Sequence, residues 1–292
     1  MKQKKVQSYF KINLRSRHPS HAPLRKELPI LPFRTIVRLG SITELDDGKA
    51  RIELNSTQSI RNSSNKFLMK QKFTECAVKT AIWYKPEIIH GDLLLVPNGN
   101  NEAPEENYRF IDSVEYPIVA KHNYGSKGKG NTLIRTKEEL NEWLKGRDLS
   151  NYIFEKFYNY AHEFRLHISK DGCFYTCRKA LKSDILEEHK WHFHDETCVW
   201  YLEDNEKFFK PNSWDDIVSD CVKALEAIGA DILAFDVKVQ SPTNRDGEDR
   251  DYQNYILLEC NSAPSMGDIT LEKYLKKIPE ILKQKYEDLL LK

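Results

Sequence analysis

The sequence predicts an α+β fold in which mostly antiparallel strands are covered by helices. From residue 116 onward, apolar strand-like segments alternate with amphipathic helical ones. Two strand segments, "EFRLHIS" and "CFYTCRK", flank Lys170-Asp171-Gly172, a strong hairpin turn. The last two strands, "DILAFDVKV" and "NYILLEC", are separated by the charged segment 240–254, which we expect to be an exposed hairpin loop.

Length and composition limit the class of protein. The 292 residues suffice for one large domain or two moderate ones, and 40% hydrophobic with 30% charged residues is typical of a globular protein. The net charge of +1 gives no global electrostatic argument for nucleic acid or a membrane. No apolar run reaches about 18 residues, and no signal-peptide core is present. The six cysteines form no C-x-x-C pair, so we expect a cytoplasmic protein without disulfides.

The first third of the chain contains few regular elements. Residues 1–60 are rich in Arg, Pro and His, and only "RTIVRLG" is typical of a strand. A helix is expected from Ser63, with Ser-Ser-Asn as its cap and Phe67, Leu68 and Phe73 as its apolar stripe. "DLLLVP" then predicts a strand, followed by a long exposed turn region.

The middle and the end of the chain are more regular. "YPIVAKH" and "NYIFEKF" predict strands on either side of a helix that Thr136 caps and Gly146 ends. Residues 182–212 are polar and aromatic and predict a long loop. Ser213 begins an amphipathic helix that ends at a glycine, and the C-terminal helix is expected to be interrupted at Pro279.

Polar residues interrupt the last two apolar strands. Alternation places four side chains on one face of the final strand: Tyr255, Leu257, Glu259 and Asn261. If the two strands pair antiparallel, Asp236 lies beside Glu259 and Asn261. Two carboxylates and one amide oxygen suit Mg²⁺, which prefers oxygen ligands. The alternative is three polar residues on a solvated sheet face.

A glycine-rich segment, "NYGSKGKGN", follows the strand that ends at Lys121. Its glycines permit close approach of the backbone to an anion, and Lys127 and Lys129 add positive charge. It matches neither a Walker A loop nor a dinucleotide fingerprint. Lys121 is placed to reach a phosphate, although an exposed turn explains the glycines equally well.

The strand "EFRLHIS" carries a third group of polar residues. Alternation leaves Glu163, Arg165 and His167 together on the face opposite its apolar residues, where a simple surface pair is the alternative. Just upstream, "IFEKF" places Glu155 and Lys156 in an otherwise apolar segment.

A fourth group lies in the segment "HKWHFHDETC". His189, His192, His194 and Cys198 are residue types that bind zinc. Their spacing matches no standard zinc pattern, so an ordinary polar loop is the favoured interpretation.

The order of these groups resembles that of the ATP-grasp superfamily over roughly residues 52–268. The segment "LLECNSAPSM" is similar to the Glu-x-Asn-x-x-Pro-Gly end of D-alanine–D-alanine ligases and ribosomal-protein glutamate ligases. "NSTQSIRNSSNKFLMKQKF" is similar to the Asn-x-x-x-x-Ile-x-x-x-x-x-Lys entry into that fold in the glutamate-ligase group. The resemblance implies an ATP-grasp fold, with two α+β lobes that clasp ATP: residues 63–157 and 158–292. Residues 1–62 would be a short N-terminal module with a part in substrate binding.

The resemblance also implies roles for individual residues. Lys66 and Lys121 would contact the ATP phosphates, beneath a closing loop with Ser126 and Gly128 as backbone contacts. The adenine hinge would comprise Glu155, Lys156 and Phe157, and Glu163 would hold the ribose. One or two Mg²⁺ ions, or Mn²⁺ in their place, would bind Asp236, Glu259 and Asn261. The transferring phosphate would face Arg165 and either Arg178 or Lys179, whereas Ala234 stands where D-alanine ligases carry an arginine.

The activity implied is ATP-dependent ligation of a carboxylate to an amine through an acyl phosphate. The partners would be a small-molecule or peptide carboxylate and an amine acceptor, with no membrane. Four N-terminal arginines are candidates to hold the acid, unless they form only a solvated basic surface: Arg15, Arg17, Arg25 and Arg38. The alternatives are a kinase of the same fold, an ATP-binding module without turnover and, third, a nucleic-acid-binding protein that uses the basic N-terminus.

Overall fold

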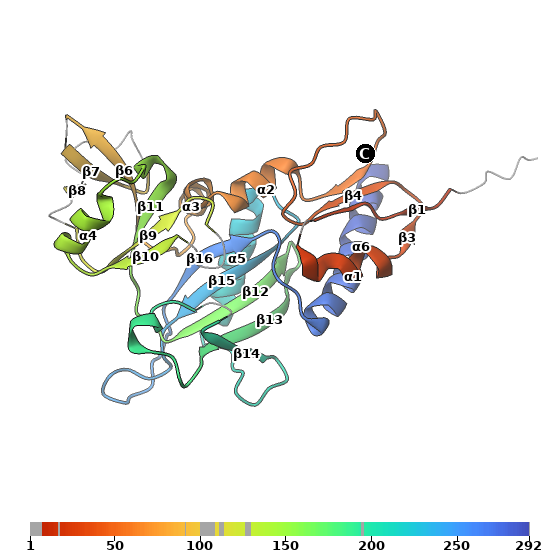
Figure 1. Cartoon of the computed structure of the whole chain (residues 1–292). Coiled ribbons are helices and arrows are strands. Elements are labelled where there is room, and N and C mark those ends of the chain that lie inside the picture. Colours follow the sequence, from red (N-terminus) through yellow and green to blue (C-terminus); the bar gives the residue numbers. More distant parts are fainter. Residues whose placement is uncertain are drawn as a thin grey trace, which may run out of the picture.

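The computed structural model describes residues 8–16, 18–90, 92–99, 109–110, 114–125, 130–193 and 196–291. Within them, the strands form sheets of six, five, three and two strands, and helices pack on the larger sheets (Figure 1). The α+β class predicted from the sequence is therefore confirmed. None of the described helices has the length and apolarity that a bilayer crossing requires.

The six-stranded sheet lies at the left of Figure 1, in the order β10-β9-β11-β6-β7-β8 with every pair antiparallel. Helix α4 covers this sheet. The Thr136 side chain accepts a hydrogen bond from the Glu139 backbone N–H, so Thr136 is the N-cap of α4, as predicted. Strand β6 was not predicted, because its proline and its irregular pattern of buried and exposed residues hide the alternation of a strand. The elements are β6 (Trp83–Ile89), β7 (Asp92–Pro97), β8 (Arg109–Phe110), β9 (Ile118–His122), β10 (Asn131–Ile134), α4 (Lys137–Leu144) and β11 (Tyr152–Lys156).

The five-stranded sheet lies at the centre of Figure 1, in the order β14-β13-β12-β15-β16. Its core face packs against α3 and α5 through Phe164, Phe235 and Ile217. Strand β14 lies inside the long loop predicted over 182–212, so that prediction is wrong in part. The strand was not recognised because its short apolar run is flanked by polar residues. The elements are β12 (His162–Ser169), β13 (Gly172–Leu181), β14 (Cys198–Leu202), α5 (Trp214–Ile228), β15 (Ile232–Val239) and β16 (Tyr255–Asn261).

A register shift in the β15–β16 pair changes which side chains share a face. Asp236 pairs with Glu259, but the next pair is Val237 with Leu257, so Leu258 is an extra residue. Tyr255 and Leu257 consequently belong to the core, while Leu258 lines the same cavity as Glu259 and Asn261. The predicted face containing Tyr255 and Leu257 together with Glu259 is therefore wrong, because strict alternation does not hold across a bulge.

The N-terminal residues form a small parallel sheet, β2-β4-β5, at the right of Figure 1. Helix α6 packs on it through Tyr274, Ile278 and Leu282. The predicted interruption at Pro279 is wrong, because α6 runs through this buried proline and its packing offsets a cost of about 3 kcal/mol. The elements are β1 (Phe10–Lys11), β2 (Leu14–Arg15), α1 (Ala22–Glu27), β3 (Ile30–Leu31), β4 (Thr35–Arg38), β5 (Ile52–Leu54) and α6 (Asp268–Leu290).

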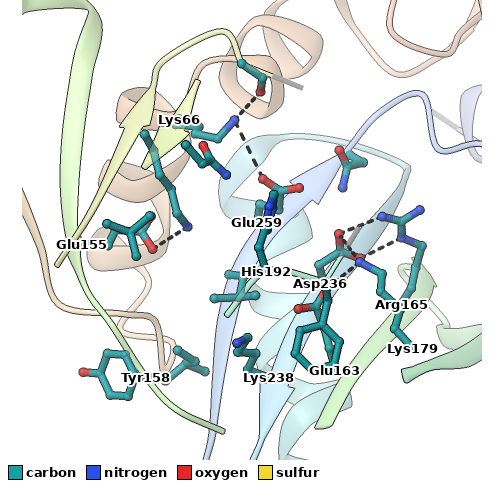
Figure 2. A pocket seen from close by; sticks show the side chains of 18 of the residues that line it. Lys66, Glu155, Tyr158, Glu163, Arg165, Lys179, His192, Asp236, Lys238 and Glu259 are labelled. Atoms are coloured by element: carbon teal, nitrogen blue, oxygen red, sulfur yellow. Dashed lines mark hydrogen bonds and ion pairs between the residues drawn. The ribbon is translucent and has the colours of Figure 1, made fainter. Parts of the chain in front are cut away.

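Two helices connect the small sheet to the six-stranded sheet along the chain. Helix α2 (Thr57–Ser64) precedes α3 (Lys66–Glu75), so the helix expected from Ser63 begins three residues later. Its start is set by Asn65, whose side chain accepts the Leu68 backbone N–H. This cap directs the first residue of α3, Lys66, toward the site described below (Figure 2).

The buried Asn55 ties the small sheet to β15. Its backbone N–H donates to Asp231 (2.8 Å), its amide donates to the carbonyls of Arg38 and Ile232 (both 3.1 Å), and its side-chain oxygen accepts two further N–H groups. We expect Asn55→Ala to lower the free energy of unfolding by about 2–3 kcal/mol, because buried partners lose their hydrogen bonds. Urea denaturation measures this, and the exposed Asn141→Ala should change the free energy of unfolding by under about 0.5 kcal/mol. An equal loss in both variants would contradict the assignment.

Candidate functional site

A cavity of about 340 Å³ is walled by residues of both large sheets (Figure 2). Lysine side chains reach it from α3 and β9, and carboxylates reach it from β11, β12, β15 and β16. Most of the residues singled out in the sequence line it: Lys66, Lys121, Glu155, Lys156, Phe157, Glu163, Arg165, Lys179, Asp236, Glu259 and Asn261.

Three further residues were predicted for the site, and the structure describes one of them, Arg178. Ser126 and Gly128 lie outside the described residues. Arg178 faces away: its guanidinium donates to the Lys207 carbonyl and lies 4.9 Å from the ring centre of Tyr201. Adjacent residues of β13 point to opposite faces, so of the two alternatives only Lys179 reaches the cavity.

The first charge cluster is built around Glu155 at the end of β11. Its carboxylate accepts a hydrogen bond from Lys121 (2.7 Å) and lies 3.3 Å from the Lys70 ammonium. Burial alone would raise the pKa of Glu155, but the two lysine charges outweigh it and lower the pKa. Burial also lowers the pKa of Lys70 to about 8, against the opposing effect of Glu155. Glu155 thus neutralises part of this cluster, and Lys70 is a residue that sequence reasoning missed.

The second charge cluster spans three neighbouring strands. Arg165 on β12 binds Asp236 on β15 through two hydrogen bonds of 2.7 and 2.8 Å. Lys179 on β13 lies 3.1 Å from Asp236 and donates to Glu163 at 2.5 Å. These contacts follow from register, since Arg165 pairs with Asp236 and Glu163 pairs with Lys179. Burial alone would raise the pKa of Asp236, but Arg165 and Lys179 hold that pKa well below its usual value.

The cavity carries more positive than negative charge. Among the described residues that line it are six lysine or arginine side chains and four carboxylates. One of the cations, Lys238, was not predicted as a site residue, although it shares a face of β15 with Asp236. Its ammonium lies 4.9 Å from the ring centre of Phe193, and burial lowers its pKa. A polyanion such as a nucleotide phosphate complements this charge.

Three oxygen-bearing side chains offer a place for a divalent cation. Asp236 and Glu259 occupy paired positions, and Asn261 follows on the same strand. The Asn261 amide nitrogen is buried and has no hydrogen-bond partner among the described residues. The nitrogen and oxygen of an amide are assigned from their partners, so a reversed amide would place a free oxygen there. These three residues fit the predicted magnesium ligands in donor type.

The N-terminal segment forms one edge of the cavity. His21 contacts the Pro264 carbonyl at 2.8 Å, the Met266 backbone N–H donates to Ser20, and His18 lines the cavity. The arginine hypothesis gains no such support: Arg38 is buried against Glu53 at 2.9 Å. Arg15 and Arg25 do not line the cavity, and Arg17 lies outside the described residues.

The histidine-containing segment also lines the cavity. Trp191, His192 and Phe193 line the cavity. The sequence did not predict this, because the three residues lie in a polar and aromatic loop without periodicity. Within the described part of the chain, no three His, Cys, Asp or Glu side chains gather as a metal site, and His194 lies outside it. The zinc alternative therefore gains no support.

Comparison with solved structures defines the fold. D-Alanine–D-alanine ligase from Bacillus anthracis, complexed with ATP, aligns over 87% of this chain and 81% of its own, with a TM-score of 0.57 and 14% identity. Biotin carboxylase from Campylobacter jejuni aligns over 85% of this chain but only 54% of its own (TM-score 0.56, 13% identity). N5-Carboxyaminoimidazole synthetase from Staphylococcus aureus, complexed with ADP, aligns over 85% and 60% (TM-score 0.56, 14% identity).

These similarities show that the chain has the ATP-grasp fold, as the sequence resemblance implied. The likeness lies in structure rather than in sequence, because no family model and no curated protein matches the chain. The division at residues 62 and 157 and the roles of the individual site residues stay predictions.

Proposed function

We propose that this protein is an ATP-dependent carboxylate–amine ligase. The observation that carries the proposal is the arrangement of one cavity, in which Lys66 lies on the side opposite Asp236 and Glu259 (Figure 2). Asn261 lines the same cavity. Lys66 links the two sides, since its ammonium lies 3.8 Å from Glu259. Cations and oxygen ligands on opposite walls suit a nucleotide whose phosphates lie between them.

In this proposal each part of the cavity holds one part of ATP. Lys66 and Lys121 bind phosphate oxygens, and the lining includes an apolar surface for the base: Val119, Phe157, Ile256 and Leu258. Asp236, Glu259 and Asn261 would hold magnesium, which would supply neutralising charge for the phosphates. The same carboxylate and amide oxygens also suit manganese in place of magnesium.

The proposed chemistry has two steps. A substrate carboxylate oxygen attacks the γ-phosphorus, the bond to the β-phosphate oxygen breaks, and an acyl phosphate and ADP form. An amine nitrogen then attacks the acyl carbon, phosphate leaves, the nitrogen loses a proton and an amide remains. Arg165 and Lys179 stabilise negative charge during both steps. Arg165 contacts Asp236 from the neighbouring strand. Arg165 thereby supplies positive charge that Ala234 cannot supply at the position where D-alanine ligases have arginine.

The test uses hydroxylamine as the amine, because it converts an acyl phosphate into a hydroxamate. With pools of amino acids and peptides, we expect carboxylate-dependent release of ADP and phosphate in equal amounts together with hydroxamate. A phosphorylated alcohol without free phosphate would establish the kinase instead, and bound nucleotide without turnover would establish the binding module. The control omits the carboxylate, which should reduce ADP release to background.

The compartment stays part of the proposal. All six cysteines are free thiols, which supports a reducing, cytoplasmic setting.

A further inference from the structure

A second cavity, of about 420 Å³, adjoins the first and shares Arg165 and Ser265 with it. It lies beside the outer strands β13 and β14 and the first turn of α6. This volume is in the range of small-molecule sites. If the first cavity holds ATP, as proposed above, the second is the adjoining space in which a substrate would reach the transferring phosphate.

The boundary between the two cavities carries a positive charge. Arg165 uses its Nε and Nη2 atoms to bind Asp236, which occupies two of the five guanidinium N–H donors. Its guanidinium also lies 5.0 Å from the ring centre of Trp200, a residue of the second cavity. The remaining donors, those on Nη1 among them, suit a carboxylate placed between the cavities.

Away from Arg165, the second cavity is largely apolar and aromatic. Trp200, Leu202 and Ile269 supply apolar surface. Tyr175 is almost fully buried, and its hydroxyl donates no hydrogen bond to any of the described residues. Burial raises the pKa of Tyr175 to about 12, and the neighbouring Thr270 hydroxyl acts against that rise. This hydroxyl is a donor left for a ligand.

The remaining charges disfavour a second acidic group on that ligand. Burial lowers the pKa of His167 to about 3, so its ring is neutral near pH 7. Asp268 adds a negative charge, and Arg165 is the single lysine or arginine among the described residues that line the second cavity. A dicarboxylic acid would therefore place one carboxylate without a cationic partner.

We propose that the second cavity binds the substrate acid, that the carboxylate of this acid lies on Arg165, and that the rest of the acid is apolar. This inference deepens the proposed ligase activity and rests on it for the chemistry. Binding of such an acid does not require turnover, so the two proposals can fail separately.

The test measures binding by calorimetry in the presence of a non-hydrolysable ATP analogue and Mg²⁺. The probes are N-acetyl-phenylalanine and N-acetyl-leucine, compared with N-acetyl-aspartate and N-acetyl-glutamate. We expect the apolar acids to bind about tenfold or more tightly than the acidic ones. The same four acids are then assayed for hydroxamate formation.

Two variants on one strand distinguish the cavity from a general effect. Leu202→Lys adds a cation inside the cavity, and it should weaken the apolar acids about tenfold and reverse the preference toward the acidic ones. Val199→Lys is the matched control, because Val199 is exposed on β14 and does not line the cavity. It should leave all four affinities unchanged.

Each outcome decides one of the two proposals. Preferential binding of apolar acids that Leu202→Lys reverses supports the cavity assignment, even if no hydroxamate forms; the absence of hydroxamate with every acid would instead count against the ligase. Equal binding of all four acids, no binding, or equal effects of the two lysine variants would overturn the cavity assignment. Hydroxamate formation from other acids would leave the ligase intact in that case.

Discussion

Glu259→Gln is expected to lower ATP-dependent ADP release by about a thousandfold, the loss typical of removing one charged group that stabilises a transition state. The substitution keeps the shape of the side chain and removes only its charge. Because the Glu259 carboxylate is partly exposed and its ion pair with Lys66 is 3.8 Å long, little folding energy depends on it. The measurement is ADP release over a range of Mg²⁺ concentrations.

The magnesium dependence separates this role from a structural one. The variant should need a higher Mg²⁺ concentration for half-maximal activity, while its thermal unfolding stays close to that of the wild type. Glu248→Gln, in the exposed loop between β15 and β16, is the matched control and should keep full activity. A fall of less than about tenfold in Glu259→Gln would remove Glu259 from the proposed metal ligands.

Much of this site could be predicted because strands obey a simple rule. Alternation placed Asp236 beside Glu259 once the strands were taken as antiparallel, and the register confirms that pair. The same rule failed at Leu258, because one extra residue in β16 moves Tyr255 and Leu257 to the core. A bulge leaves no clear mark in a short apolar run, so a single sequence does not reveal it.

Other parts of the site depend on contacts between distant segments. Lys70 lies within a helix of ordinary composition, and only the fold brings it to Glu155, 85 residues away. The Asn55 side chain donates to backbone carbonyls of Arg38 in β4 and Ile232 in β15, and no pattern of side chains in the sequence predicts these contacts. That Trp191 and Phe193 line the cavity was not predicted for the same reason. An aromatic loop has no periodicity from which its contacts in the fold can be predicted.

Asp236→Asn is expected to destabilise the protein by about 3–5 kcal/mol, because it leaves the buried Arg165 without its counter-charge. The Arg165 side chain is 13% exposed and that of Asp236 is 4% exposed, so water replaces little of the lost interaction. Lys179 keeps Glu163 as a partner and should contribute less to the loss. Urea denaturation near pH 7 measures the difference.

The pH dependence of that difference has a defined sign. The pKa of Asp236 is depressed in the folded state, so its contribution is fully present above the unfolded pKa of 3.8 and is lost as the pH falls toward the folded value. The stability gap between wild type and Asp236→Asn should therefore be constant from about pH 5 to 7 and shrink below about pH 4. A gap that stays constant through that acid range would contradict the ion pair as its cause.

A double-mutant cycle tests whether Arg165 is the partner responsible. Arg165→Met alone leaves Asp236 with Lys179, whereas Arg165→Met combined with Asp236→Asn removes both members of the buried pair. Because no charge is then left unpaired, the double variant should be more stable than additive losses predict, by about 2 kcal/mol. Additive losses would mean that Asp236 is held mainly by Lys179. The Arg165 guanidinium would then be less firmly fixed between the two cavities than the proposed positioning of the substrate acid requires.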